Sequence, residues 1–140
     1  MKSATEHFAR QTAALTDAIA FVEKFIDSSR VPSEMNSLTA FVVEELFTNM
    51  VKYNPTGPPT VTITLQVTDG KLVIIMEDHS VKPFDLTKAK PVNTHLPLNE
   101  MKPGGLGIHL VRQMMDEVHF DFDGEINRTT LIKYLENNDV

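Results

Sequence analysis

Apolar residues change their spacing along this chain from a helical period to a strand period, and this change constrains the fold more than any other feature. Over residues 12–28 they recur every three or four positions, which predicts an amphipathic helix. A second helix is expected to begin at a cap provided by Ser33 or Ser37 and to end near residue 53, before a proline-rich segment. Over residues 61–67 apolar and polar side chains alternate, which is typical of a half-buried strand.

The second half of the chain continues with strand and turn signals. Asp69-Gly70 predicts a tight turn, and residues 71–77 predict a more fully buried strand after it. Residues 79–103 contain four prolines and little periodicity, so we expect a long loop of the kind that forms lids or binding loops. A third helix is expected to open at the glycines of residues 104–107, with an apolar side made of Leu106, Leu110, Val111 and Met114.

A short strand at residues 6–10 and a final hairpin complete the predicted elements. The hairpin would join residues 118–122 to residues 129–135 through a turn near Gly124. Together the elements predict an α+β fold, a two-layer sandwich of a mostly antiparallel sheet with its helices on one face. At 140 residues, the chain is expected to form a single domain over residues 1–140.

Charge and composition argue against several classes of function. The formal net charge is −6 and no cluster of five or more basic residues occurs, which argues against nucleic acid as the main partner. No apolar run approaches the roughly 18 residues needed to span a membrane, and the N-terminus lacks the apolar core of a secretion signal. The chain has no cysteine, which excludes disulfides and thiolate chemistry and fits a cytoplasmic location.

A carboxylate and an amide in the second predicted helix form the first candidate for chemistry. Glu45 and Asn49 stand four positions apart and therefore share one face, with Lys52 close to the same stripe. A carboxylate can act as a general base, and an amide oxygen is a suitable ligand for Mg²⁺. A solvated helix face is the simpler interpretation of such a pair taken alone, although Asn49 is a poor helix former that stands among apolar neighbours.

Asp78, directly after the predicted strand at residues 71–77, is the second candidate. A carboxylate at a strand end can accept a hydrogen bond from an exocyclic amine such as that of adenine. Taken alone, residues 77–80 are better interpreted as a polar turn.

Three glycines within four positions, Gly104, Gly105 and Gly107, form the third candidate. Glycines before a helix let the backbone approach an anion, and the first N–H groups of the helix face it, which favours a phosphate. No Walker loop is present, because no Gly-Lys-Ser or Gly-Lys-Thr follows. A helix-entry turn without any ligand is the alternative.

Taken together and in this order, the three segments resemble the Bergerat-fold (histidine kinase-like) ATPases, and most of all the bacterial anti-sigma factor serine-protein kinases of the RsbW type. The helix motif E-x-x-x-N is similar to EELFTNMVKYN, and the box that ends in P-F-D is similar to EDHSVKPFDL. The G-G-L-G motif with its aliphatic helix and M-D-x-V ending is similar to GGLGIHLVRQMMDEV. The likeness covers about residues 8–136.

The resemblance implies a role for each motif. Glu45 would be the catalytic residue that polarises the attacking hydroxyl or water, and Asn49 would hold Mg²⁺ against the phosphates of ATP. Asp78 would read the adenine amine, while residues 87–103 would close as a lid. The remaining cofactor-binding residues that the resemblance implies are Lys52, Ser80, Phe84, Gly104, Gly105, Leu106, Gly107, Ile108 and Thr130.

By the same resemblance, the chain would be an ATP-dependent protein kinase that phosphorylates a serine or threonine of an anti-sigma factor antagonist, a STAS-type protein. It would also sequester a sigma factor and form a homodimer. The alternative is a non-catalytic, ATP-dependent binding module in a signalling pathway, and a third interpretation is an α+β scaffold without a ligand. The sequence departs from the family's pattern at Ser80, where glycine is usual, at Lys52 and at Asn54.

Overall fold

The computed structural model describes residues 1–53, 60–79 and 105–135, and within these ranges it contains one five-stranded sheet and three α-helices. Every strand pair is antiparallel, and the strand order across the sheet is β1-β2-β3-β5-β4. In chain order the elements are β1 (Lys2–Ala9), the 3₁₀-helix η1 (Thr12–Ala14), α1 (Leu15–Ser28), α2 (Glu34–Tyr53), β2 (Thr60–Thr68), β3 (Lys71–His79), α3 (Gly105–Met114), β4 (Glu117–Phe122) and β5 (Ile126–Tyr134).

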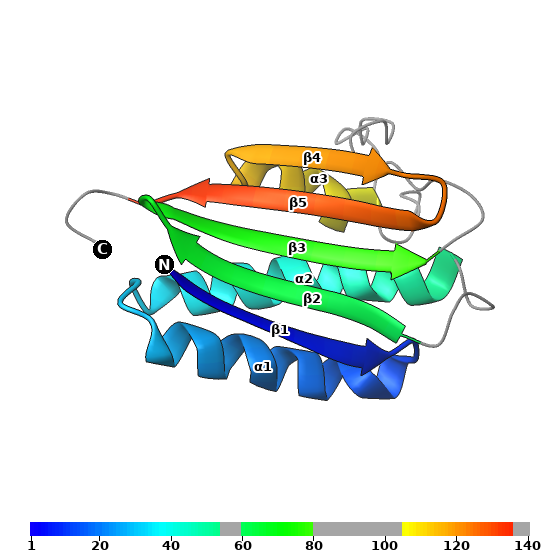
Figure 1. The fold of residues 1–140 in the computed structure, drawn as a ribbon, viewed down its shortest axis with the longest axis horizontal. Helices are drawn as coiled ribbons and strands as arrows, with labels where there is room; N and C mark the ends of the chain where they lie inside the picture. Colours follow the sequence, from blue (N-terminus) through cyan, green and yellow to red (C-terminus); the bar gives the residue numbers. More distant parts are fainter. Residues whose placement is uncertain (54–59, 80–104, 136–140) are drawn as a thin grey trace.

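The helices form the second layer, behind one face of the sheet (Figure 1). In this view α1 runs beside and behind β1, α2 lies behind the middle strands, and α3 lies behind β4 and β5. The core fills the space between the two layers and draws its large side chains from both, among them Phe47, Leu46, Ile63, Leu65, Leu72, Ile74, Met76 and Leu131. The predicted α+β sandwich with helices on one face is therefore confirmed.

The helix α1 follows the predicted spacing, and α2 ends at the predicted residue, Tyr53. The buried side of α1 consists of Ala18, Val22, Phe25 and Ile26, which recur every three or four positions. At its end the hydroxyls of Ser28 and Ser29 donate to the Phe25 carbonyl, which would otherwise lack a helical partner. The helix α2 begins at Glu34, so that Ser33 flanks it while Ser37 lies inside it.

The β2–β3 hairpin has the turn that the Asp-Gly pair predicts. Asp69 has φ 50° and Gly70 has φ 73°, which are the two positive values that a type I′ turn requires. The turn fixes the register, so that Val61 pairs with Asp78 at the other end of the hairpin.

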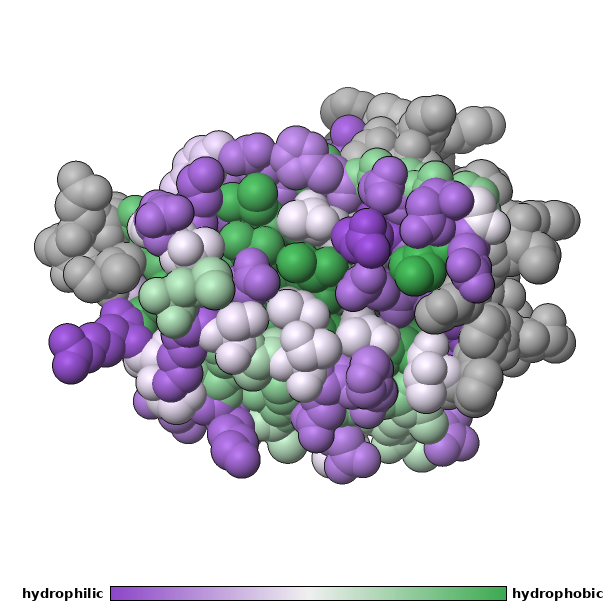
Figure 2. Space-filling view, in the orientation of Figure 1, coloured by the Kyte–Doolittle hydropathy of each residue, from purple (hydrophilic) through white to green (hydrophobic). Residues whose placement is uncertain are grey.

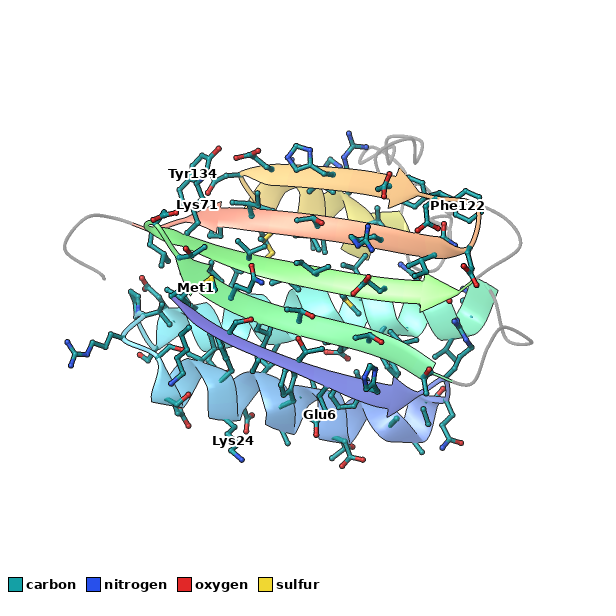
Figure 3. The ribbon with its side chains drawn as sticks, viewed as in Figure 1. Met1, Glu6, Lys24, Lys71, Phe122 and Tyr134 are labelled. Atoms are coloured by element: carbon teal, nitrogen blue, oxygen red, sulfur yellow. The ribbon has the colours of Figure 1, made fainter. Side chains whose placement is uncertain are left out.

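One row of paired residues crosses the whole sheet at the end to which Asp78 belongs. From edge to edge the row reads Phe8, Val61, Asp78, Asn127 and Phe122. Its members face the helices, and the first four are at least nine-tenths buried. Figure 3 shows Phe122 at this end of the sheet and Tyr134 at the opposite end. Asp78 and Asn127 are therefore two polar side chains in a row that is otherwise apolar.

The outer face of the sheet, which carries no helix among the described residues, is mixed in character. Polar side chains cover most of it, with apolar patches over the middle strands (Figure 2). Val73, Ile75 and Ile132 supply apolar side chains there by their register. Arg128 bridges Glu77 and Asp121 on neighbouring strands, at 3.0 Å and 3.3 Å.

Three boundaries or faces differ from the sequence-based expectation. β1 begins at Lys2 rather than at residue 6, because it is an edge strand with only one fully buried side chain, Phe8, and so gives little apolar alternation. β5 begins at Ile126, well before residue 129. Leu110, predicted on the apolar side of the third helix, is 37% exposed, whereas Val111, predicted on the same side, is 0% exposed.

No described helix is long and apolar enough to cross a membrane.

Candidate functional site

The pair Glu45 and Asn49 lies on the inner side of α2, in its second half. Asn49 is 3% exposed and Glu45 is half-buried, so neither occupies a fully solvated helix face. Among the described residues, the amide nitrogen Nδ2 of Asn49 is buried without a hydrogen-bond partner. A buried amide without a partner costs about 1–3 kcal/mol, so a polar group is expected to approach it when the site is filled.

The carboxylate of Glu45 lies against the glycine segment at the start of α3. A Cβ placed on Gly107 would stand 2.0 Å from Oε2 of Glu45, 2.3 Å from Cδ and 2.9 Å from Oε1. Real Cβ atoms essentially never approach a heavy atom this closely, so Gly107 leaves the space that the carboxylate occupies. The helix motif and the glycine motif, which are far apart in the sequence, therefore meet at one place.

The environment of Glu45 favours its neutral form. Burial raises the pKa of the Glu45 carboxyl above its ordinary value, and the nearby charge of Glu44 raises it further. A carboxylate with a raised pKa is a stronger proton acceptor once it is ionised, which suits a general base near neutral pH.

Asp78 lies at the end of β3 and is buried, at 4% exposed. Its Oδ1 accepts a hydrogen bond from the guanidinium of Arg10, and the two side chains are only 2% and 5% exposed. Arg10 also donates to the main-chain carbonyl of Met50 on α2, at 3.1 Å. Because Met50 directly follows Asn49, Arg10 connects the end of β3 to the part of α2 that carries the amide.

The other residues predicted to bind the cofactor lie in different parts of the structure, and some lie outside the described residues. Gly105 and Leu106 open α3, and Ile108 is half-buried and packs against the core. Lys52 is exposed in the last turn of α2. Ser80, Phe84, Gly104 and the expected lid at residues 87–103 lie outside the described residues.

Thr130 is not brought to this site. It pairs with Ile75 in β3 and points to the outer face of the sheet, whereas its neighbour Thr129 is 3% exposed and faces the helices. Successive side chains of a strand alternate between its two faces, so a shift of one residue exchanges inside for outside. On this strand Thr129 and Asn127, rather than Thr130, stand on the side of Asp78.

Sequence reasoning also missed Arg10 and Asn127. Arg10 directly follows β1 and is drawn inward by Asp78, a contact between distant segments that no local pattern indicates. The alternation of β5 carried a usable signal for Asn127, because this residue takes an inward position two places before Thr129 and four before Leu131.

A groove of about 830 Å³ runs between β1 and α1, and it is separate from this constellation. None of Glu45, Asn49, Asp78 and Gly107 lines it. The groove is therefore a different surface feature. Its lining includes Lys2, Glu6, Asp17, Phe21 and Lys24.

Comparison with known proteins identifies the fold and the family. Residues 8–133 match the histidine kinase-like ATPase domain family. The serine-protein kinase RsbW of Bacillus licheniformis is 30% identical over 107 residues, covering 70% of this chain and 64% of that protein. The RsbW of Halalkalibacterium halodurans is 26% identical over 102 residues, covering 70% of this chain and 62% of that protein. The chain thus spans less than two thirds of the length of these relatives.

Solved structures share the fold at low identity. The RsbU and RsbW domains of Rv1364c from Mycobacterium tuberculosis superimpose with a TM-score of 0.67 at 9% identity, covering 96% of this chain and 32% of that one. The histidine kinase AdeS of Acinetobacter baumannii gives a TM-score of 0.55 at 14% identity, covering 98% of this chain and 70% of that one. From the family match over residues 8–133 and the antiparallel sheet with its helices on one face, the chain belongs to the histidine kinase-like ATPase domain family.

Proposed function

We propose that this chain binds ATP with Mg²⁺ and transfers the γ-phosphoryl group to a serine or threonine of a partner protein. The observation that carries this proposal is the contact between the Glu45 carboxylate and Gly107. It joins a general-base candidate to the start of a ten-residue helix, whose first N–H groups favour an anion. The two curated relatives are both serine-protein kinases, which supports the same chemistry.

Each motif takes one part of the ligand in this proposal. Asp78 accepts a hydrogen bond from the exocyclic amine of adenine, at the end of β3. The first N–H groups of α3, which begins at Gly105, would face the phosphate oxygens. The described residues contain no cluster of three or more His, Cys, Asp or Glu side chains able to hold a metal alone. The cation would therefore depend on the nucleotide's phosphates as well as on the protein.

The residues present fit Mg²⁺. Asn49 would offer its carboxamide oxygen to the cation, while its buried Nδ2, a donor that lacks a partner among the described residues, would suit a phosphate oxygen of the nucleotide. A triphosphate beside the Glu45 carboxylate would bring like charges together, and Mg²⁺, held by the Asn49 oxygen, would supply charge neutralisation at the phosphates when bound.

Phosphoryl transfer to a hydroxyl requires one proton acceptor. The hydroxyl oxygen of the substrate serine or threonine forms a bond to the γ-phosphorus, and the bond between that phosphorus and the β,γ-bridging oxygen breaks to release ADP. Glu45 accepts the proton that the hydroxyl loses. Its half-buried position suits this role, since the raised pKa of the carboxyl makes it a better base than an exposed glutamate.

We further propose that the partner is an anti-sigma factor antagonist of the STAS type, that the chain also sequesters a sigma factor, and that residues 1–140 form one domain. The RsbW names of the relatives support this choice of partner. Incubation with γ-labelled ATP and a panel of STAS-type proteins tests the chemistry, because wild type should label one of them and Glu45→Ala should not. Labelling at the full rate by Glu45→Ala would show that the base is misassigned.

The groove between β1 and α1 supports a homodimer. β1 is an edge strand, and α1 runs antiparallel to it, so that Lys2 contacts the Ser28 carbonyl. Lys2 and Lys24 therefore lie toward one end of the groove, and Glu6 and Asp17 lie toward the other. A second copy related by a two-fold axis would place positive against negative at both ends.

Sedimentation of Lys24→Glu tests the dimer. Glu6 and Lys24 both lie along this edge of the molecule (Figure 3). Reversal of the charge at Lys24 should weaken the dimer, and Glu6→Lys in the same chain should restore part of it. A wild-type chain that sediments as a monomer at high concentration would contradict the dimer.

The alternative is a regulatory module that binds ATP without catalysis. The same groups would hold the nucleotide, so nucleotide binding alone does not separate the two. Partner binding that follows ATP occupancy, without any phosphoprotein, would favour the module. A third possibility, a scaffold without a ligand, predicts no stabilisation by MgATP. A ligand at 100 times its dissociation constant should stabilise the fold by about 2.7 kcal/mol.

A further inference from the structure

The buried ion pair between Arg10 and Asp78 has no role in the phosphoryl transfer described above. Both side chains are nearly excluded from solvent, at 2% and 5% exposed, so the pair is part of the interior and not a surface contact. Arg10 holds Oδ1 of Asp78 with one nitrogen, Nη2, while its Nη1 donates to the Met50 carbonyl at 3.1 Å. The guanidinium is thus fixed at two points, on β3 and on α2.

This arrangement determines what Asp78 can offer a ligand. The carboxylate of Asp78 is paired with the guanidinium of Arg10, and carboxylate oxygens accept hydrogen bonds but do not donate them. Because Oδ1 is held by Arg10, the orientation of the second oxygen, Oδ2, is set as well.

We infer that Arg10 is a positioning residue that determines nucleobase specificity. It presents Oδ2 of Asp78 as a fixed, obligate acceptor and so selects a purine with an amine at C6 over one with a carbonyl. The inference rests on the proposed function, in which Asp78 faces the base. Arg10 also donates to the Met50 carbonyl, so the residue that positions Asp78 is itself anchored on α2, the helix that carries Asn49.

The test exploits the difference between a carboxylate and an amide. In Asp78→Asn, Arg10 should attract the amide oxygen and leave the amide nitrogen facing the base, which turns an acceptor into a donor. ITP carries a carbonyl where ATP carries the amine, so this variant should prefer ITP. In Arg10→Met/Asp78→Asn the guanidinium no longer holds the amide oxygen, so the amide can present either end and the preference should disappear.

Calorimetric titration of each protein with MgATP and MgITP provides the measurement. Wild type should bind ATP about tenfold or more tightly than ITP, since a mismatched pair leaves a buried polar group unsatisfied. Asp78→Asn should reverse that order, and Arg10→Met/Asp78→Asn should bind the two within about threefold. Arg10→Lys/Asp78→Asn keeps a cation at the position and should retain part of the reversal.

The matched control is Arg128→Met, which removes a half-exposed arginine whose ion pairs lie on the outer face of the sheet. It should leave the ratio of ATP to ITP affinity unchanged. The double variant removes both buried charges together, and a thermal melt shows whether it is folded.

The outcomes separate the two levels of the proposal. If wild type binds neither nucleotide, the proposed function fails and the role of Arg10 fails with it. If wild type prefers ATP but Asp78→Asn has the same ratio with Arg10 as without it, the proposed function stands and the role of Arg10 is refuted. The role of Arg10 is also refuted if Asp78→Asn still prefers ATP as strongly as wild type does.

Discussion

Replacing Gly107 with alanine should damage catalysis while leaving the fold intact. The added Cβ would lie 2.0 Å from Oε2 of Glu45, and only contacts of 3.4 Å or more are ordinary, so the carboxylate must retreat. The end of the side chain would move by more than about 1 Å, and a misplacement of that size costs about 100-fold in rate. That loss corresponds to about 2.7 kcal/mol of transition-state stabilisation.

Stability should respond in the opposite direction. Gly107 is helical and is not among the described glycines with positive φ, so alanine at this position gains up to about 1 kcal/mol of helix propensity. Part of that gain in folding stability offsets the cost of displacing the Glu45 side chain. The melting temperature of Gly107→Ala should therefore equal or exceed that of wild type, while its kcat for phosphoryl transfer falls.

Gly70→Ala is the matched control with the reverse pattern. Gly70 has φ 73° and no heavy atom within 4 Å of an added Cβ, and it lies at the other end of β3 from Asp78. Alanine there should cost about 1–2 kcal/mol through the left-handed backbone and leave kcat unchanged.

Glu45→Asp, whose side chain is shorter, should be less harmful in the Gly107→Ala background than in wild type. If Gly107→Ala transfers phosphate at the wild-type rate while Glu45→Ala does not, catalysis requires Glu45 but does not require its contact with Gly107.

Three further changes test individual residues. Asn49→Leu should stabilise the unliganded fold by about 1 kcal/mol, because it removes a buried Nδ2 that has no hydrogen-bond partner among the described residues, and should abolish the rise in melting temperature on addition of MgATP. Glu45→Gln should be more stable than wild type at neutral pH, with the difference shrinking as the pH falls. Because the pKa of Glu45 is raised in the folded state, the stability that this side chain contributes is complete at acid pH and is lost as the pH rises through that pKa. Urea titrations at several pH values measure the difference in unfolding free energy between Glu45→Gln and wild type, and a difference that does not change with pH would refute this expectation. Arg10→Met should cost about 3–5 kcal/mol in urea unfolding, and adding Asp78→Asn should recover part of it, because the first change leaves a buried charge alone.

The sequence predicted most of the fold because its signals are local. The helical spacing of α1, the alternation of β2 and the Asp69-Gly70 turn each depend on neighbouring residues, and each is confirmed. The edge strand β1 was predicted too short, since a strand with one buried apolar side chain leaves little alternation to detect.

The motifs of the candidate site could be predicted from the sequence, but the contacts between them could not. Glu45 and Asn49 share a helix face by spacing alone, but the contact of Glu45 with Gly107 depends on how α2 and α3 pack. The partnership of Arg10 with Asp78 depends on the sheet order, which places the ends of β1 and β3 on the same side of the molecule. Thr130 shows the sensitivity of strand assignments, because an error of one residue moves a side chain to the other face.

Mapping the amide signals of the labelled protein during an MgATP titration tests most directly whether the three motifs form one site. The amides of Asn49, Asp78 and Gly107 should shift along a single saturation curve, while those of Phe21 and Lys24 in the β1–α1 groove stay in place. Shifts confined to the groove, or separate curves for the three motifs, would contradict a common nucleotide site.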